Sequence, residues 1–216
     1  MSLDKNLAEI FDADRALRAA ERKLLSGKPA DVQKLLMAAV EEASRLEDRE
    51  EAGMRLSRLA DLCAQVPSPA MADALILILN DDEPSVRAEA GEALTDMAYD
   101  LYAEVARAIV RALDRKLSGP ALMELPFLLA EVGEPSALPL IKRFLEHSDK
   151  EVVAAAIESL AALGDPSAIE LLEPFVDDER VVSVGDDDDE NLQATLGQLA
   201  EETIAALSGE DEEDDD

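Results

Sequence analysis

The residue types that most often carry out enzyme chemistry are scarce in this chain. Histidine and cysteine each occur once, as His147 and Cys63. A cysteine nucleophile needs a neighbouring base, usually histidine, and these two lie 84 positions apart. His147 stands in EHSDKE, which is typical of a turn between helices, whereas Cys63 stands in the apolar LADLCAQV, which favours a buried position. We therefore expect neither residue to be catalytic.

Patterns that bind phosphates or metals are also missing from the sequence. Gly27, Gly53 and Gly91 stand alone rather than in a glycine-rich loop. The acidic run Asp186–Asn191 offers carboxylates that calcium could bind, but it lacks the glycine and glutamate spacing of an EF-hand loop. We expect a solvated run of charge there, with calcium binding as the alternative. The sequence thus predicts no catalytic residue, no cofactor and no metal site, and a protein that is not an enzyme.

The charge restricts the class of partner. The chain has 20 Lys and Arg against 50 Asp and Glu, which gives a net charge of −30. Much of this charge falls in two short segments, 177–190 and 210–216. Such a surface repels nucleic-acid phosphates and anionic lipid headgroups, and it attracts basic proteins. We expect a protein partner with a basic or amphipathic segment, and neither nucleic acid nor membrane.

The composition predicts a helical protein. Apolar residues make up 48% of the chain, but only 3% are aromatic, and Ala and Leu dominate, which suits closely packed helices. Arg180–Val184 (RVVSV) is the one strand-like run. No segment resembles a signal peptide or approaches the roughly 18 apolar residues that span a bilayer. We therefore expect an all-α protein. The single cysteine, which can form no intramolecular disulfide, fits a reducing cytoplasm.

These helices repeat along the chain. The tripeptide Pro-Ser-Ala begins at Pro135 and again at Pro166, 31 residues later. A shift of 66 residues, or two units of 33, places residues 69–98 over residues 135–164 without a gap. Each unit reads as two helices with apolar stripes, and only the stacking of neighbouring pairs would bury those stripes continuously.

The boundary between two units has its own short signature. Gly133 and Gly164 are each followed by an acid, Glu134 or Asp165, and then by Pro-Ser-Ala. We expect both glycines to end a helix in the left-handed conformation and both acids to cap the next helix. Proline is tolerated in the first turn of that helix because its missing N–H would be unpaired there in any case.

Residues 135–164 (PSALPLIKRFLEHSDKEVVAAAIESLAALG) resemble a HEAT repeat of the short bacterial kind. The family pattern has Pro-x-Ala, Leu-x-x-Leu, an Asp-rich turn, Val-Arg, and Ala-x-x-Ala-Leu before a glycine. Residues 69–98 match it with Asp81 in the turn and Arg87 after a valine. His147 and Val153 replace the family's Asp and Arg in the later unit, so we expect an incomplete Asp–Arg ladder between repeats.

The resemblance implies a right-handed α-solenoid of about five helix pairs, with an N-terminal capping helix. It covers residues 69–209 well and the N-terminal third loosely. We divide the chain into a capping helix at 1–28, a degenerate repeat at 29–67, HEAT-like repeats at 68–209 with an acidic insertion at 177–190, and a disordered acidic tail at 210–216. Terminal repeats of such arrays need a polar outer face, which is why the first helix is interpreted as a cap.

The resemblance further implies that the second helix of each pair lines a concave surface that binds proteins. On the helical wheel, the outward positions of successive second helices are Glu92 and Thr95, then Met123 and Phe127, then Glu158. An apolar pair between carboxylates would suit a basic amphipathic helix or peptide. The alternative is that Met123 and Phe127 belong to the core of a slightly rotated helix.

Three functions remain open from the sequence. The first is a non-enzymatic scaffold or adaptor that holds a protein partner on the concave acidic surface. The second is an electrostatic shield or chaperone for a basic protein, which would release its partner at moderate salt. The third rests on the HEAT resemblance alone, since the family includes enzymes such as bilin lyases, and such an enzyme would bind its pigment visibly.

Overall fold

The computed structural model describes residues 3–183 and 193–209, and these are mostly helical, as predicted. Each helix begins and ends close to a break in the apolar pattern. The helices are α1 (Leu3–Leu25), α2 (Pro29–Ala43), α3 (Arg49–Ala64), α4 (Pro69–Leu79), α5 (Pro84–Asp114), α6 (Ala121–Val132), α7 (Ala137–Leu145), α8 (Lys150–Leu163), α9 (Ile169–Leu172) and α10 (Leu196–Ser208). Single 3-10 turns at Pro166–Ala168 and Glu173–Phe175 extend α9 at both ends.

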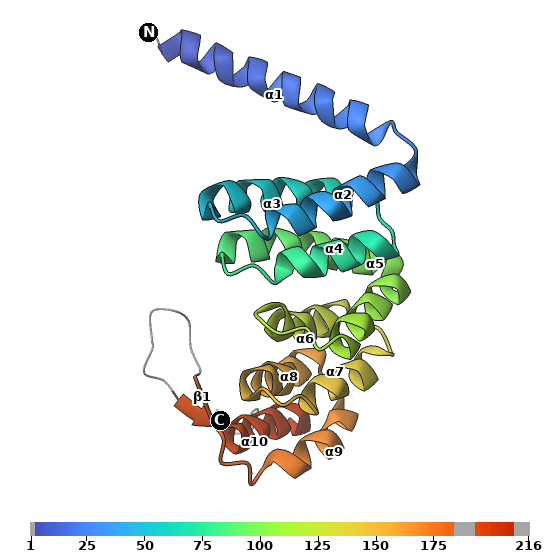
Figure 1. Ribbon diagram of the computed structural model, residues 1–216. Helices are drawn as coiled ribbons and strands as arrows, with labels where there is room; N and C mark the ends of the chain where they lie inside the picture. Colours follow the sequence, from blue (N-terminus) through green and yellow to red (C-terminus); the bar gives the residue numbers. More distant parts are fainter. Residues whose placement is uncertain (1–2, 184–192, 210–216) are drawn as a thin grey trace.

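The helices after α1 stack in two layers (Figure 1). One layer, which we call the second-helix layer, consists of α3, residues 84–100 of α5, α6, α8 and α10, and its neighbours contact one another in that order. The other layer holds α2, α4, residues 102–114 of α5, α7 and α9. A single hydrophobic cluster runs from Val32 in α2 to Ala200 in α10. The pairs therefore share one continuous core, as the stacking argument predicts.

Two glycines end their helices as expected, whereas only one of the two acids caps the next helix. Gly133 and Gly164 have φ angles of 64° and 66°, and each N–H bonds the carbonyl four residues earlier. Asp165 accepts a hydrogen bond from the Ser167 N–H at 2.9 Å. The expectation for Glu134 is wrong, because α7 begins at Ala137 and its first turn has no side-chain cap.

Helix α5 joins two units that the sequence separates. The repeat pattern places a boundary after residue 98, but the helix continues to Asp114. Only Leu101 leaves the helical conformation, at φ −134° and ψ 44°, and it kinks the helix there. Neither glycine nor proline stands at this boundary, so nothing in the local sequence ends the helix.

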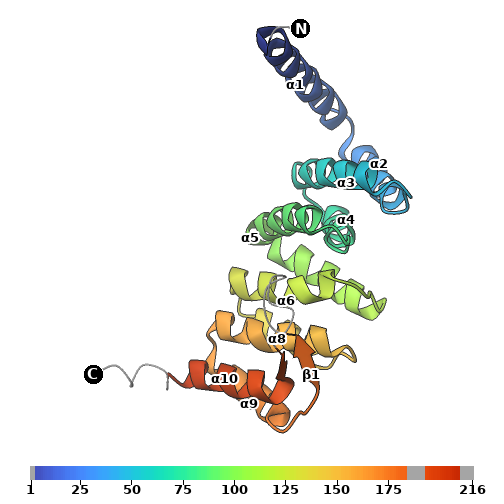
Figure 2. The same cartoon turned by 90° about the vertical axis from the view of Figure 1, so that its left-hand side faces the viewer.

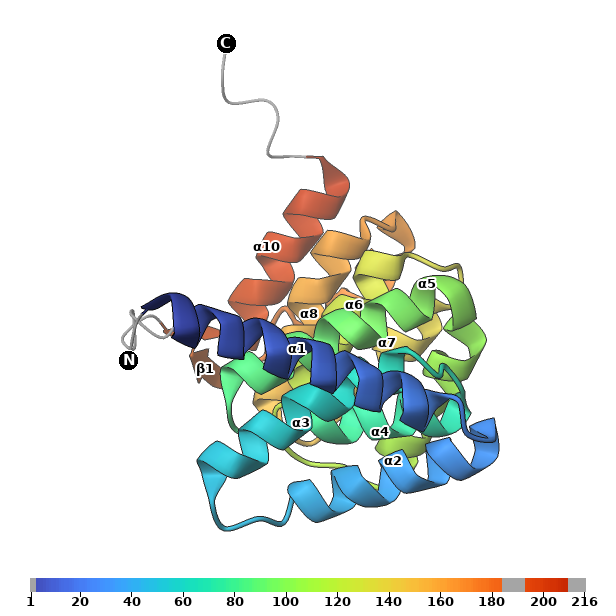
Figure 3. The same ribbon diagram turned by 90° about the horizontal axis from the view of Figure 1, so that it is seen from above.

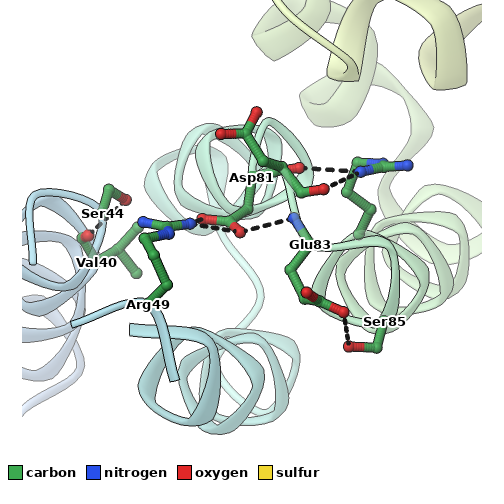
Figure 4. A network of polar contacts seen from close by, with 8 residues as sticks. Val40, Ser44, Arg49, Asp81, Glu83 and Ser85 are labelled. Carbon is green, nitrogen blue, oxygen red and sulfur yellow. Dashed lines mark hydrogen bonds and ion pairs between the residues drawn. The ribbon is translucent and has the colours of Figure 1, made fainter. Parts of the chain in front are cut away.

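Asp81 ties the pair α2–α3 to the pair α4–α5 (Figure 4). Its carboxylate, nearly buried in the turn after α4, accepts bonds from Arg49 Nη2 at 2.6 and 2.8 Å and from the Glu83 N–H at 3.0 Å. Arg87 Nη1 donates to the carbonyls of Asp81 and Asp82 at 3.2 and 2.9 Å.

Two units later the corresponding contacts differ, because His147 replaces Asp81 and Val153 replaces Arg87. Val153 is buried in the core, and His147 Nδ1 accepts the Asp149 N–H at 3.1 Å. As predicted, the Asp–Arg ladder is incomplete. In the other layer, Arg111 bonds Asp73 at 3.0 Å and Arg143 bonds Asp114 at 2.7 Å, and both ion pairs join successive helices.

Helix α1 does not cover the first pair as a cap would. Figures 1 and 2 show it diverging from the array toward its N-terminus, and Figure 3 shows it running across the open end. None of its residues is buried. Leu24 and Leu25 pack partly against the core, and Glu21 pairs with Arg58 of α3 at 3.3 Å.

The strand-like run forms a short β-hairpin. Strand β1 (Val181–Ser183) pairs antiparallel with β2 (Gln193–Thr195), with Val182 opposite Ala194. Helix α10 begins at Leu196, where Thr195 and Gln198 form a capping box. Residues 184–190 of the acidic insertion and the tail 210–216 lie outside the described residues. No helix in the described part of the chain is long and apolar enough to cross a membrane.

Candidate partner-binding groove

A groove of about 540 Å³ opens between α5 and α6 in the second-helix layer. We call it the α5–α6 groove. Its walls come from the outward faces of the two helices and from the turn before α5. The lining residues are Leu79, Pro84, Arg87, Ala88, Gly91, Glu92, Thr95, Asp96, Tyr99, Glu124, Phe127, Leu128 and Glu131. Residues about 30 positions apart in the chain thus meet in one concave feature.

Three of the five sequence-predicted residues line this groove. Glu92 and Thr95 come from α5, and Phe127 comes from α6. Phe127 keeps 39% of its surface exposed and Met123, one turn earlier on the same helix, keeps 38%. Both therefore lie at the surface, and the alternative that they are core residues of a rotated helix is wrong. Met123 lies beside the groove and does not line it.

Glu158, the fifth predicted residue, is separate from the groove. It projects from α8, and the structure does not bring it to Glu92 or Phe127. Its pKa is raised above the usual value, mainly because the surrounding protein removes water from the carboxylate, although part of the residue stays exposed. The negative charge of Glu202 on α10 raises the pKa further.

Sequence reasoning missed Tyr99, the most exposed aromatic residue of the groove. Tyr99 keeps 59% of its surface exposed and lines the groove together with Phe127. The repeat pattern places it at the start of the next unit, whereas α5 continues through it. Helical spacing could have predicted this position, since Tyr99 follows Thr95 by four residues and therefore lies on the same face of the helix.

Carboxylates dominate the polar lining of the groove. Glu92, Asp96, Glu124 and Glu131 face one guanidinium, that of Arg87. Arg87 is already engaged, because it bonds two backbone carbonyls and its Nε lies 3.6 Å from Glu124 Oε1. Within the described part of the chain, the other three carboxylates make no ion pair. The groove therefore combines an apolar centre with uncompensated negative charge.

The acidic surface continues past α5 toward α3. A second hollow of about 390 Å³ shares Glu92 and Asp96 with the α5–α6 groove and adds Glu21, Asp61 and Glu89. Arg58 is the one cation among its lining residues, and it is paired with Glu21 and Asp61. A ligand that extends along the array from the groove would thus meet carboxylates over successive helices.

The residues that could do chemistry are placed as expected. Cys63 is fully buried in α3, and this burial raises the pKa of its thiol to about 12, so the reactive thiolate is not formed near neutral pH. His147 lies in the turn between α7 and α8 and not beside Cys63. No group of three or more His, Cys, Asp or Glu in the described ranges could hold a metal ion. The carboxylates of 186–190 are outside those ranges.

Stacked helix pairs around one continuous core define a helical repeat protein. Residues 100–184, which include α6, α7 and α8, match the family model of HEAT repeats. The resemblance to HEAT repeats is thereby confirmed for this part of the chain. No curated protein matches the chain.

Proposed function

We propose that this protein is a non-enzymatic scaffold or adaptor that holds a protein partner in the α5–α6 groove. The partner would present a basic amphipathic helix or peptide. One of its apolar side chains would pack on Phe127 and Tyr99, and its Lys or Arg residues would lie near the carboxylates around them. HEAT repeats commonly mediate binding between proteins, which favours this class of function.

The observation that carries the proposal is the combination of exposed aromatics and unpaired carboxylates in one groove. Phe127 and Tyr99 are the large apolar side chains that remain exposed there. An aromatic anchor in a hollow, surrounded by polar groups, is the usual arrangement of residues that dominate binding energy. The three unpaired carboxylates set the sign of the charge that a partner must bring.

The electrostatic shield remains the second candidate, and the net charge of −30 favours it. The two functions differ in their salt dependence. The attraction between exposed charges decays over a Debye length of about 10 Å at 0.1 M salt and weakens further as salt rises. Contacts between buried apolar groups are not screened by salt. A shield would therefore release its partners at moderate salt, and an aromatic-anchored adaptor would retain its partner.

Affinity capture from a lysate of the source cells tests the proposal. The wild-type protein and two variants are compared at low and high salt. Phe127→Ala removes the proposed anchor, and Met54→Ala is the matched control, since Met54 is an exposed apolar residue of α3 outside the groove. We expect one partner that survives high salt, binds the control normally and binds Phe127→Ala about tenfold more weakly, or 1.4 kcal/mol. Equal retention by all three proteins would place the binding surface elsewhere.

We also propose that the array has about five helix pairs with a right-handed superhelix. Five pairs follow if residues 84–100 and 102–114 of α5 belong to different pairs, as the kink at Leu101 and the contacts of the two halves suggest. The hand follows from the HEAT resemblance, and an experimental structure would test it directly.

A further inference from the structure

Helix α1 carries an apolar face that nothing in the described structure covers. Five large apolar residues recur at helical spacing along one side, and each keeps between 38% and 86% of its surface exposed. They are Leu3, Leu7, Ile10, Phe11 and Leu17. The same face reaches the array only at the end of the helix, where Glu21 pairs with Arg58 and Leu24 packs on the core. A row of apolar residues this long on an exposed helix marks an interaction surface.

The charge of α1 differs from that of the rest of the chain. Residues 3–25 contain five acidic and five basic residues, so the helix is neutral and the remaining residues carry the whole net charge of −30. The helix is also divided along its length. Residues 3–14 hold four acids and one lysine, for a charge of −3, and residues 15–25 hold four basic residues and one acid, for a charge of +3.

We propose that two copies of this protein pair through their α1 helices in antiparallel orientation. An antiparallel pair places the acidic half of each helix beside the basic half of the other, whereas a parallel pair places like charges together. When Leu7 of one copy lies beside Leu17 of the second copy, the two Phe11 side chains meet at the centre. Asp4 then lies near Arg18 of the second copy.

Charge also argues for a second copy as the occupant of this face. A basic partner would meet attraction at the N-terminal half of α1 and repulsion at the C-terminal half, and an acidic partner would meet the reverse. A second α1 matches both halves at once. Because α1 is neutral and extends away from the array (Figure 2), two copies can meet there while their acidic bodies stay apart.

The molar mass of the full chain in solution tests the pairing. We expect light scattering after size exclusion to give about twice the chain mass of 23.3 kDa. Ile10→Asp should give the monomer mass at every protein concentration from about 1 to 100 µM, a range that covers a dimer Kd in the micromolar region. Ala8→Asp is the matched control, since it adds the same charge two residues away on the opposite side of the helix, and it should remain a dimer.

Loss of the dimer in Ile10→Asp would not reflect a failure to fold, because α1 has no buried residue, and circular dichroism should show an unchanged array. A wild-type protein that is monomeric at every concentration would overturn the proposal, including the case in which α1 folds back onto its own α2 and α3. A dimer that persists in Ile10→Asp would overturn it as well, since the interface would then lie elsewhere.

Single cysteines test the orientation, because the native Cys63 is buried. In the antiparallel pair, Phe11→Cys should form an intermolecular disulfide on mild oxidation. Leu3→Cys should not, because the two copies of residue 3 would be ~27 Å apart at 1.5 Å per residue. Cross-linking of both variants would indicate a parallel pair and contradict the proposal. Neither residue belongs to the α5–α6 groove, so partner capture there is a separate outcome.

Discussion

Replacement of Asp81 by alanine should destabilise the protein much more than the same change at Asp114. Both carboxylates pair with an arginine of a neighbouring helix pair at similar distances, 2.6 Å for Arg49 and 2.7 Å for Arg143. The Asp81 side chain is only 6% exposed, however, whereas the Asp114 side chain is 62% exposed. The two variants therefore test whether burial, rather than the presence of an ion pair, determines the contribution to stability.

The magnitude for Asp81→Ala follows from its contacts. The charge-assisted bonds from Arg49 contribute about 1.5 kcal/mol, and the bond from the Glu83 N–H about 1 kcal/mol. Arg49 is half exposed and can regain water, so the variant leaves no buried unpaired cation. We expect a loss of about 2–3 kcal/mol in the free energy of unfolding. Asp114→Ala should change it by less than about 0.5 kcal/mol, as is usual for an exposed ion pair.

Urea unfolding followed by circular dichroism at 222 nm measures both effects. In a thermal melt, the same loss for Asp81→Ala should lower Tm by about 5–10 °C for a chain of this size. Equal destabilisation by the two substitutions would refute the argument from burial. A neutral Asp81→Ala would show that the contacts around the turn after α4 do not hold the two helix pairs together.

Two further predictions concern a titrating carboxylate and a strained turn. Glu158 has a raised pKa in the folded protein, so the folded state binds its proton more tightly, and stability falls as pH rises from the unfolded pKa of about 4.5 through the folded value. Glu158→Gln should therefore raise Tm at pH 7 and have little effect at pH 4. An equal effect on Tm at both pH values would contradict the raised pKa. Gly119 has φ +117°, and an added Cβ would lie 2.6 Å from Oδ1 of Asn80, whose side chain bonds the Ser118 carbonyl and the Ala121 N–H. Gly119→Ala should therefore lower the free energy of unfolding, measured in urea, by about 2 kcal/mol. A loss below about 0.5 kcal/mol would contradict the argument from strain.

Much of the array could be predicted from the sequence because each helix pair repeats the same local signals. Apolar spacing and the breaks near proline and glycine predicted paired helices, and the expected degenerate repeat at 29–67 contains α2 and α3. Gly133 and Gly164 predicted two helix ends correctly, since the left-handed conformation strongly favours glycine. The outward position of Phe127 followed from the same periodicity, applied by analogy between repeats.

The structure differs from the predictions where the local sequence carries no signal that fixes a helix end or the surface that a helix packs on. Helix α5 runs through Leu101 because no residue stops it, and this continuity brings Tyr99 to the groove. Glu134 fails to cap α7 because that helix begins three residues after it. The expected capping role of α1 rests on the rule that terminal repeats need a polar outer face. Helix α1 instead exposes an apolar stripe, and such a stripe does not specify which surface covers it. The charge pattern of α1 favours a second copy instead of its own array.

The measurement that tests the central claim most directly is site-specific photo-crosslinking beside the groove. A photoreactive residue at position 123, next to Phe127 and outside the groove lining, should cross-link one protein in cells. The cross-linked peptide, sequenced by mass spectrometry, should be basic and amphipathic, and the product should disappear in Phe127→Ala. The same residue at position 35, which is also exposed but lies on α2, should not give that product. If position 35 gives the same product, or if the product persists in Phe127→Ala, the α5–α6 groove is not the binding site.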